Sequence, residues 1–119
     1  MKIAVASSGQ DLEAPVDLRF GRAAGFIVYD TETGETNTAD NRMNLNAAQG
    51  AGIQTAQNVA ATGAGAVIAA NYGPKAVQVL KAAGVKMYLC SQGTVGQAIE
   101  DYKSGKLTEA SGANVRSHW

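Results

Sequence analysis

The chain has 119 residues, enough for one domain of the commonest size with a hydrophobic core that needs no disulfide or metal. Ten basic and ten acidic side chains give a formal charge of zero, so no overall field attracts nucleic acid or an anionic membrane. Cys90 is the only cysteine, which excludes an intrachain disulfide and favours a reducing cytoplasm. We expect no signal peptide and no membrane span, because the sequence has neither a basic leader nor a long apolar run.

The first part of the chain predicts three strands and a long connection between the first two. Strands are expected at 2–7 and 26–30, with a weaker one at 35–39. The short turn 31–34 makes the last two of these an antiparallel hairpin. The segment 10–24 is polar and interrupted by glycine, so we expect an irregular loop of a length that is often functional.

The rest of the chain alternates helices with strands, after a loop at 40–46. The elements expected are a helix ending at Gly63, a strand at 66–70, a helix opening at Gly73-Pro74, a strand at 85–89 and a helix from Thr94 to Gly105. Residues 106–119 show no periodicity. We therefore expect a single domain at 1–105 followed by a flexible tail at 106–119.

This order of elements predicts an α/β domain with three layers. Strand–helix–strand units favour parallel pairing with right-handed crossovers, whereas the early hairpin is antiparallel. The simplest result is a mixed five-stranded sheet flanked by helices, with a ribonuclease-H-like topology. A flavodoxin-like fold is the alternative, but it needs a helix between the first two strands, and the segment 10–24 is a poor candidate for one.

That topology brings basic and polar side chains to one edge of the sheet. The connections that meet there are 8–25, 40–46, 71–74 and 90–94. Open α/β sheets bind ligands at this edge, and helix amino ends add free N–H groups and partial positive charge suited to anions. The candidate ligand-binding residues are Arg19, Arg22, Arg42, Met43, Asn44, Asn71, Gly73, Lys75 and Ser91.

The motif Asp17-Leu18-Arg19-Phe20-Gly21-Arg22 stands out within the long loop. Arginine carries a permanent charge and a rigid fork of donors, and glycine lets the backbone approach a ligand. The alternative is a solvated loop in which Phe20 only fills the core. We favour anion contacts for Arg19 and Arg22, with Phe20 as the plug that fixes the loop.

No familiar catalytic or metal-binding pattern accompanies these residues. The sequence has no phosphate-binding loop and no cysteine–histidine cluster, and its one histidine, His118, lies in the expected tail. Met43 and Cys90 are the weak candidates for metal ligands, because packing is the favoured explanation for both side chains. We therefore expect a binding protein or carrier, not an enzyme.

Two alternatives stay open. The first is an enzyme acting on a small anionic substrate, with a general base among Asp11, Glu13 and Asp17. The second is a regulatory module that contacts a partner protein through residues 106–119. Neither is supported by a motif of its own in the sequence.

The run Asp17-x-Arg19-Phe20-Gly21-Arg22-Ala23-x-x-Phe26-x-Val28-x-Asp30 resembles the signature of the nitrogenase iron–molybdenum cofactor biosynthesis family. Gly50-x-Gly52-Ile53 and Gly73-Pro74-Lys75-Ala76 are similar to it as well, and the resemblance covers about residues 1–104. It implies a ribonuclease-H-like domain that binds a metal–sulfur cluster without catalysis. The cluster would be a molybdenum–copper sulfide, or an iron–molybdenum-type cluster or its precursor.

The resemblance also indicates how such a cluster would be held. An anionic thiomolybdate suits arginine, lysine and backbone donors better than a cage of thiolates. Many family members carry a histidine in the loop entering the first helix, but Met43–Gln49 has none. Selection of a soft metal would then fall to Met43, Cys90 or the sulfides of the cluster itself.

Overall fold

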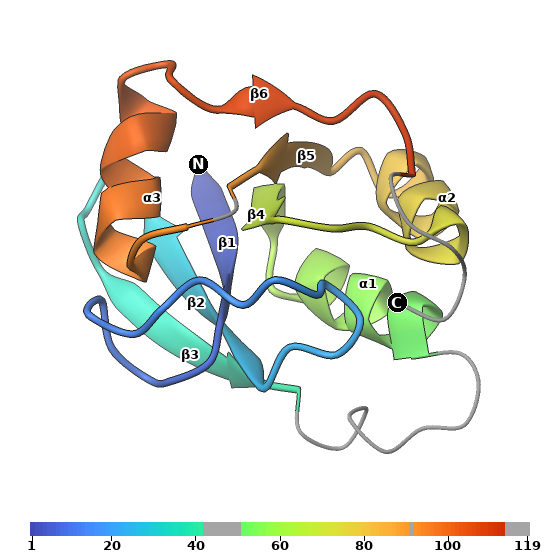
Figure 1. The fold of residues 1–119 in the computed structure, drawn as a ribbon, viewed down its shortest axis with the longest axis horizontal. Coiled ribbons are helices and arrows are strands. Elements are labelled where there is room, and N and C mark those ends of the chain that lie inside the picture. The colour runs from blue at the N-terminus through green and yellow to red at the C-terminus, as the bar shows by residue number, and fades with distance from the viewer. Residues whose placement is uncertain (42–50, 91, 114–119) are drawn as a thin grey trace.

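A computed structural model describes residues 1–41, 51–90 and 92–113 of the chain. Within these ranges the strands form one sheet in the order β3-β2-β1-β4-β5-β6, with helices on both faces (Figure 1). The strands are β1 Lys2–Ser7, β2 Gly25–Asp30, β3 Thr36–Asp40, β4 Ala64–Ala69, β5 Lys86–Leu89 and β6 Thr108–Glu109. The helices are α1 Ala51–Ala61, α2 Pro74–Ala82 and α3 Val95–Lys103.

The sheet is mixed, as the sequence predicts. Strand β1 pairs antiparallel with β2, which pairs antiparallel with β3. Strands β1, β4 and β5 are parallel to one another, and the helical crossovers α1 and α2 join β3 to β4 and β4 to β5. The carboxyl ends of β1, β3, β4 and β5 therefore lie at one edge of the sheet, where the long loop 8–24 also begins.

The two faces of the sheet carry separate hydrophobic clusters. Helices α1 and α2 cover one face and α3 covers the other (Figure 1). The α1/α2 cluster includes Ala4, Phe26, Val67, Val59 and Leu80, all buried. The α3 cluster includes Ile3, Val5, Ile68, Val95 and Ile99. The alternation of side chains along β1 supplies both clusters, because successive residues of a strand point to opposite faces.

The sheet has six strands in the described residues, so the prediction of five is wrong by one. Strand β6 pairs antiparallel with β5, and Ala110 N–H donates to the Met87 carbonyl at 2.8 Å. Ala110 is buried, and the Lys81 ammonium donates to the Ser111 carbonyl at 3.0 Å. A strand of two exposed residues leaves no apolar pattern, and its place comes from pairing with a distant strand.

The segment 108–111 therefore packs on the domain, although the sequence predicts it as part of a flexible tail. Residues 114–119 lie outside the described residues. The likeness to ribonuclease H stays a prediction. None of the helices in the described residues is long and apolar enough to cross a membrane.

Tyr72 joins the sheet edge to the core from the connection between β4 and α2. Its side chain is fully buried, and its hydroxyl shares one hydrogen between the Val67 carbonyl at 3.1 Å and the Tyr88 carbonyl at 2.8 Å. Burial raises the pKa of Tyr72 far above its ordinary value of 10.0. The hydroxyl therefore stays protonated in the folded protein at alkaline pH.

Replacing Tyr72 by Phe tests this contact. Tyr72→Phe should lower the free energy of unfolding near neutral pH by about 1–3 kcal/mol, because two buried carbonyls lose a donor. Above about pH 10, Tyr72 loses its proton in the unfolded chain but keeps it in the folded protein. Deprotonation therefore favours the unfolded state of the wild type, and the Phe variant has no such effect. The difference between wild type and variant should therefore shrink as pH rises above about 10. Urea unfolding at about pH 8 and about pH 11 measures it, and a constant difference would contradict this assignment.

Candidate functional site

The long loop 8–24 runs across the edge of the sheet formed by the carboxyl ends of β1 and β4 (Figure 1). It continues the sheet locally, since Val16 forms an antiparallel bridge with Ser7 and Arg19 a parallel bridge with Asn71. Asp17 N–H donates to the Ala6 carbonyl at 2.8 Å. Phe20 N–H donates to the Asn71 carbonyl at 3.1 Å. The loop is thus fixed by backbone hydrogen bonds to two parallel segments.

The first part of the loop is tied to the start of α3. Val95 N–H donates to the Ala14 carbonyl at 2.9 Å, and Gly96 N–H donates to the Leu12 carbonyl at 2.8 Å. A Cβ at Gly96 would lie only 3.2 Å from the Leu12 oxygen, so this close approach favours glycine. The loop therefore spans the edge from α3 on one face to α1 and α2 on the other.

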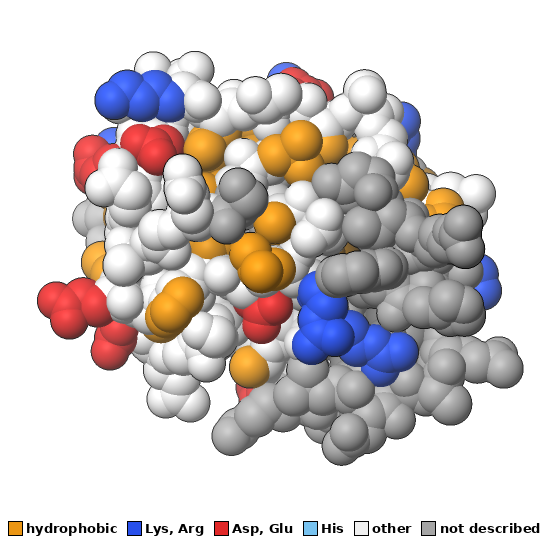
Figure 2. Space-filling model, viewed as in Figure 1, with side chains coloured by type: hydrophobic (Ala, Val, Ile, Leu, Met, Phe, Trp, Pro, Cys, Tyr) orange, Lys and Arg blue, Asp and Glu red, His pale blue; other side chains and the backbone are white. Residues whose placement is uncertain are grey.

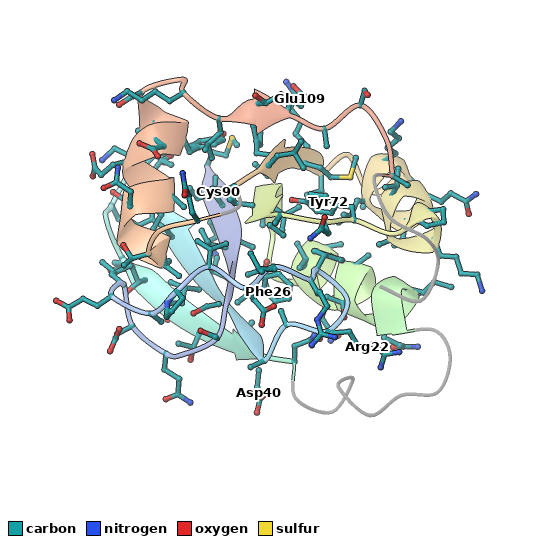
Figure 3. The ribbon with its side chains drawn as sticks, viewed as in Figure 1. Arg22, Phe26, Asp40, Tyr72, Cys90 and Glu109 are labelled. Carbon is teal, nitrogen blue, oxygen red and sulfur yellow. The ribbon has the colours of Figure 1, made fainter. Side chains whose placement is uncertain are left out.

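Phe20 fills the core beneath the second part of the loop, as predicted. The side chain is fully buried, and its ring centroid lies 5.5 Å from that of Phe26 and 5.3 Å from that of Tyr72. Arg19 and Arg22 flank this plug. Arg19 is exposed, whereas Arg22 is half-buried and lies beside α1 (Figure 3).

The connection between β4 and α2 contributes the other described candidates. The Asn71 amide donates from Nδ2 to the Leu18 carbonyl at 2.8 Å, so its side chain holds the loop with one of its two N–H donors. Gly73 is the N-cap of α2 and provides no side-chain cap, and Pro74 occupies the first turn. Lys75 follows and is exposed. The amino end of α2, with its dipole and N–H groups, therefore opens beside the loop that carries Arg19.

Basic side chains gather on the face of the molecule that this edge presents. Figure 2 shows basic side chains near the position at which Figure 3 labels Arg22, with acidic atoms close beside them, and both acidic and basic side chains on the α3 side. The arrangement suits an anion. In the described part of the chain, no group of three or more His, Cys, Asp or Glu side chains could hold a metal ion directly.

Four of the candidate residues lie outside the described residues: Arg42, Met43, Asn44 and Ser91. Cys90 is described and is buried in the cluster on the α3 face, with its thiol donating to the Gln92 carbonyl at 3.2 Å. Phe20 and Tyr72 belong to the cluster on the opposite face. The structure therefore brings Arg19, Asn71 and Gly73 together and packs Cys90 elsewhere.

A hollow of about 130 Å³ lies at the same edge, over the ends of β1 and β3. It is lined by Ser8, Gly9, Gln10, Ala24, Gly25, Phe26, Thr38, Ala39 and Asp40. None of the predicted basic residues lines it, and Asp40 gives it a negative charge. The hollow therefore lies apart from the basic residues that the sequence predicts for an anion site.

A buried polar network, which the sequence analysis missed, joins the arginine loop to α1. Asn41 donates from Nδ2 to the Ala23 carbonyl at 2.9 Å, and its backbone N–H donates to the Ala24 carbonyl at 3.0 Å. The Thr55 hydroxyl lies 3.2 Å from Asn41 Oδ1 and 3.3 Å from the Gly21 carbonyl. Asn41 and Thr55 are both essentially inaccessible to solvent. The only signal for this network in the sequence was Thr55, a polar residue among the alanines on the inner face of α1.

In small α/β domains of this kind, the carboxyl ends of the parallel strands are where ligands and cofactors commonly bind. Residues 1–105 match the family model described as dinitrogenase iron-molybdenum cofactor, and the chain belongs to this family. The family resemblance of the Asp17–Asp30 signature is thereby confirmed.

Solved structures and a sequence relative agree with this assignment. The apo form of the orange protein from Desulfovibrio gigas is 42% identical, with a TM-score of 0.93 and 96% of each chain covered. A NifB-like protein from Thermotoga is 41% identical, with a TM-score of 0.81 and 91% of each chain covered. An uncharacterised protein of Methanocaldococcus jannaschii is 34% identical over 95 residues, 74% of this chain and 76% of the relative.

The contact between Asn71 and the loop gives a local prediction. Asn71→Ala should remove the hydrogen bond to Leu18 and lower the free energy of unfolding by about 1 kcal/mol. It should also speed hydrogen exchange at the Phe20 amide, which is bonded to the backbone of residue 71, because the loop loses its nearest anchor. The Asp17 amide, bonded to Ala6, is the internal control. Equal protection of the Phe20 amide in both proteins would show that the side chain of Asn71 does not hold the loop.

Proposed function

We propose that this protein binds and carries an anionic metal–sulfide cluster containing molybdenum, with copper as the second metal, without catalysing a reaction. Membership of the iron–molybdenum cofactor family supports a metal–sulfur cargo. The high structural similarity to the orange protein, whose structure is that of an apo form, supports a protein that exists with and without its ligand. An iron–molybdenum-type cluster or a biosynthetic precursor is the other cargo of the same class.

The bridge between Arg19 and Asn71 is the observation that carries this proposal. It holds the backbone of Arg19 beside Asn71, two residues before the N-cap Gly73 of α2, a helix that has no side-chain cap and in which Lys75 is exposed. Guanidinium, ammonium and backbone N–H groups donate to the sulfides of an anionic cluster without bonding its metals. A cage of thiolates needs several cysteines, and Cys90 is the only one in the sequence and is buried.

Within the proposal, Arg19, Arg22, Gly73 and Lys75 contact the cluster. Residues Arg42, Met43, Asn44 and Ser91 are proposed to complete the site, because they stand in loops that follow β3 and β5. We assign the choice of a soft metal to Met43 and to the sulfides of the cluster. We also place the protein in the cytoplasm, where its single cysteine stays reduced.

Two of the three carboxylates considered for an enzyme, Asp11 and Asp17, accept backbone hydrogen bonds within the loop. Asp11 Oδ1 accepts from Glu13 N–H at 3.0 Å, and Asp17 Oδ1 accepts from Arg19 N–H at 3.1 Å. Both bonds span two residues, as in the turns that aspartate forms with its own backbone. These contacts explain Asp11 and Asp17 without a catalytic role.

Reconstitution tests the proposal. Adding tetrathiomolybdate and Cu(I) to the apo protein without oxygen should give a charge-transfer spectrum that depends on the protein, with molybdenum and copper co-eluting with it in gel filtration. Arg19→Gln should weaken the apparent affinity about tenfold, because a charge-assisted hydrogen bond is lost. Lys86→Gln is the matched control, since it removes one exposed cation at the start of β5, on the opposite edge of the sheet.

Two outcomes would contradict the proposal. One is a spectrum identical to that of the metals and sulfide without protein. The other is an equal loss of affinity in Arg19→Gln and Lys86→Gln, which would show that only net charge matters.

A further inference from the structure

We infer that Thr55 and Asn41 are positioning residues that set the affinity of the site by holding the arginine loop in its binding geometry; the inference rests on the proposed function. Among the described residues, Asn41 and Thr55 are buried polar side chains, as are Ser7 and the hydroxyl-bearing Tyr72. Buried polar groups cost free energy unless they are satisfied, so such a network fixes a geometry wherever it forms.

The network reaches the loop at three backbone carbonyls, those of residues 21, 23 and 24. Gly21 O faces the Thr55 hydroxyl, Ala23 O accepts from the Asn41 amide, and Ala24 O accepts from the Asn41 N–H. Arg22 lies between the first two of these contacts. The backbone on both sides of Arg22 is therefore held from one direction, by α1 and by the residue that follows β3.

The Thr55 hydroxyl is the centre of the network because it faces two acceptors with one hydrogen. The acceptors are Gly21 O at 3.3 Å and Asn41 Oδ1 at 3.2 Å, and Asn41 Oδ1 also accepts from Asn58 Nδ2 at 3.4 Å. Whenever Thr55 donates to Gly21, Asn58 still satisfies Asn41. Loss of the hydroxyl leaves the Gly21 carbonyl buried without this donor, and the loop segment that carries Arg22 can then shift.

A permanent charge binds an anion well only when it is held in place beforehand. A cation that must be ordered at the moment of binding loses part of its contribution to side-chain and loop entropy. Residues behind the direct ligands of a metal commonly change affinity by tenfold or more although they touch no metal. Thr55 would act on Arg22 in the same way, because it contacts the backbone of the preceding residue, Gly21, and is not itself proposed to contact the cluster.

The test compares two threonine variants, one within α1 and one at the residue directly after it. Thr55→Val keeps the shape and removes the hydroxyl from the network. Thr62→Val does the same at the carboxyl end of α1, where the Thr62 hydroxyl donates to the Val59 carbonyl at 2.6 Å. In the tetrathiomolybdate and Cu(I) titration, Thr55→Val should bind about tenfold more weakly. Thr62→Val should bind as the wild type does, and Thr55→Ser, which keeps the hydroxyl, should restore most of the affinity.

A double-mutant cycle separates positioning from general destabilisation. If Thr55 acts through Arg22, then adding Thr55→Val to Arg22→Gln should cost little further affinity, while Thr62→Val with Arg22→Gln should lose only what Arg22→Gln loses alone. The affinity of Thr55→Val should also depend less steeply on ionic strength than that of the wild type, since a charge contributes less. Asn58→Ala removes one donor from the helix surface and gives a milder test should Thr55→Val fold poorly.

Three results would overturn the inference: affinity in Thr55→Val within about twofold of the wild type, full additivity with Arg22→Gln, or equal losses in Thr55→Val and Thr62→Val. A wild-type protein that gives no protein-dependent spectrum contradicts the proposed function instead. In that case, amide exchange at residues 21–24 in Thr55→Val still decides whether the network holds the loop, and unchanged exchange would contradict it.

Discussion

The anchoring of the long loop at Phe20 is the constraint on which the site depends. Ordering the backbone of one residue costs about 1–2 kcal/mol, so a loop of this length is fixed only if contacts recur along it. Phe20 supplies a hydrophobic contact and a backbone hydrogen bond at one position. Its ring packs against Phe26 and Tyr72, and its N–H donates to the Asn71 carbonyl. Arg19 directly precedes Phe20 and Arg22 follows it by two residues, so the anchor at Phe20 positions the backbone of both arginines.

The position of the anchor also bears on how a chain of zero net charge would bind the proposed anionic cluster. The formal charge excludes long-range attraction, so recognition must come from where individual donors lie. The sheet topology places the loop, the amino end of α2 and the end of β3 at one edge. Buried hydrogen bonds of Asn41 and Thr55 then fix the loop against α1. The basic residues of this edge are thus brought together by the sheet topology and the buried hydrogen bonds, and not by a net charge of the chain.

Much of this architecture could be predicted from the sequence because the signals are local. The apolar strands, the hairpin, the proline at the start of α2 and the Thr94 cap of α3 all follow from short patterns, and Thr94 does accept from Gln97 N–H at 3.2 Å. The role of Phe20 was predictable as well, since a lone aromatic in a polar loop usually enters the core.

The features that were missed depend on contacts between distant segments. Strand β6 has two residues and forms because this segment pairs with β5 and Ala110 bonds to Met87. The link from Thr55 to Gly21 joins residues 34 positions apart, and in the sequence Thr55 is only a polar residue among alanines. For Cys90 the residue type was misleading instead: cysteine often binds metals, but here the side chain is part of the core.

The most direct test of the central claim is anomalous X-ray scattering at the molybdenum and copper absorption edges, from crystals of the protein loaded with tetrathiomolybdate and Cu(I). The account predicts coincident peaks at the sheet edge between the Arg19–Arg22 loop and the amino end of α2. Peaks at Cys90, or in the hollow beside Asp40, would contradict it.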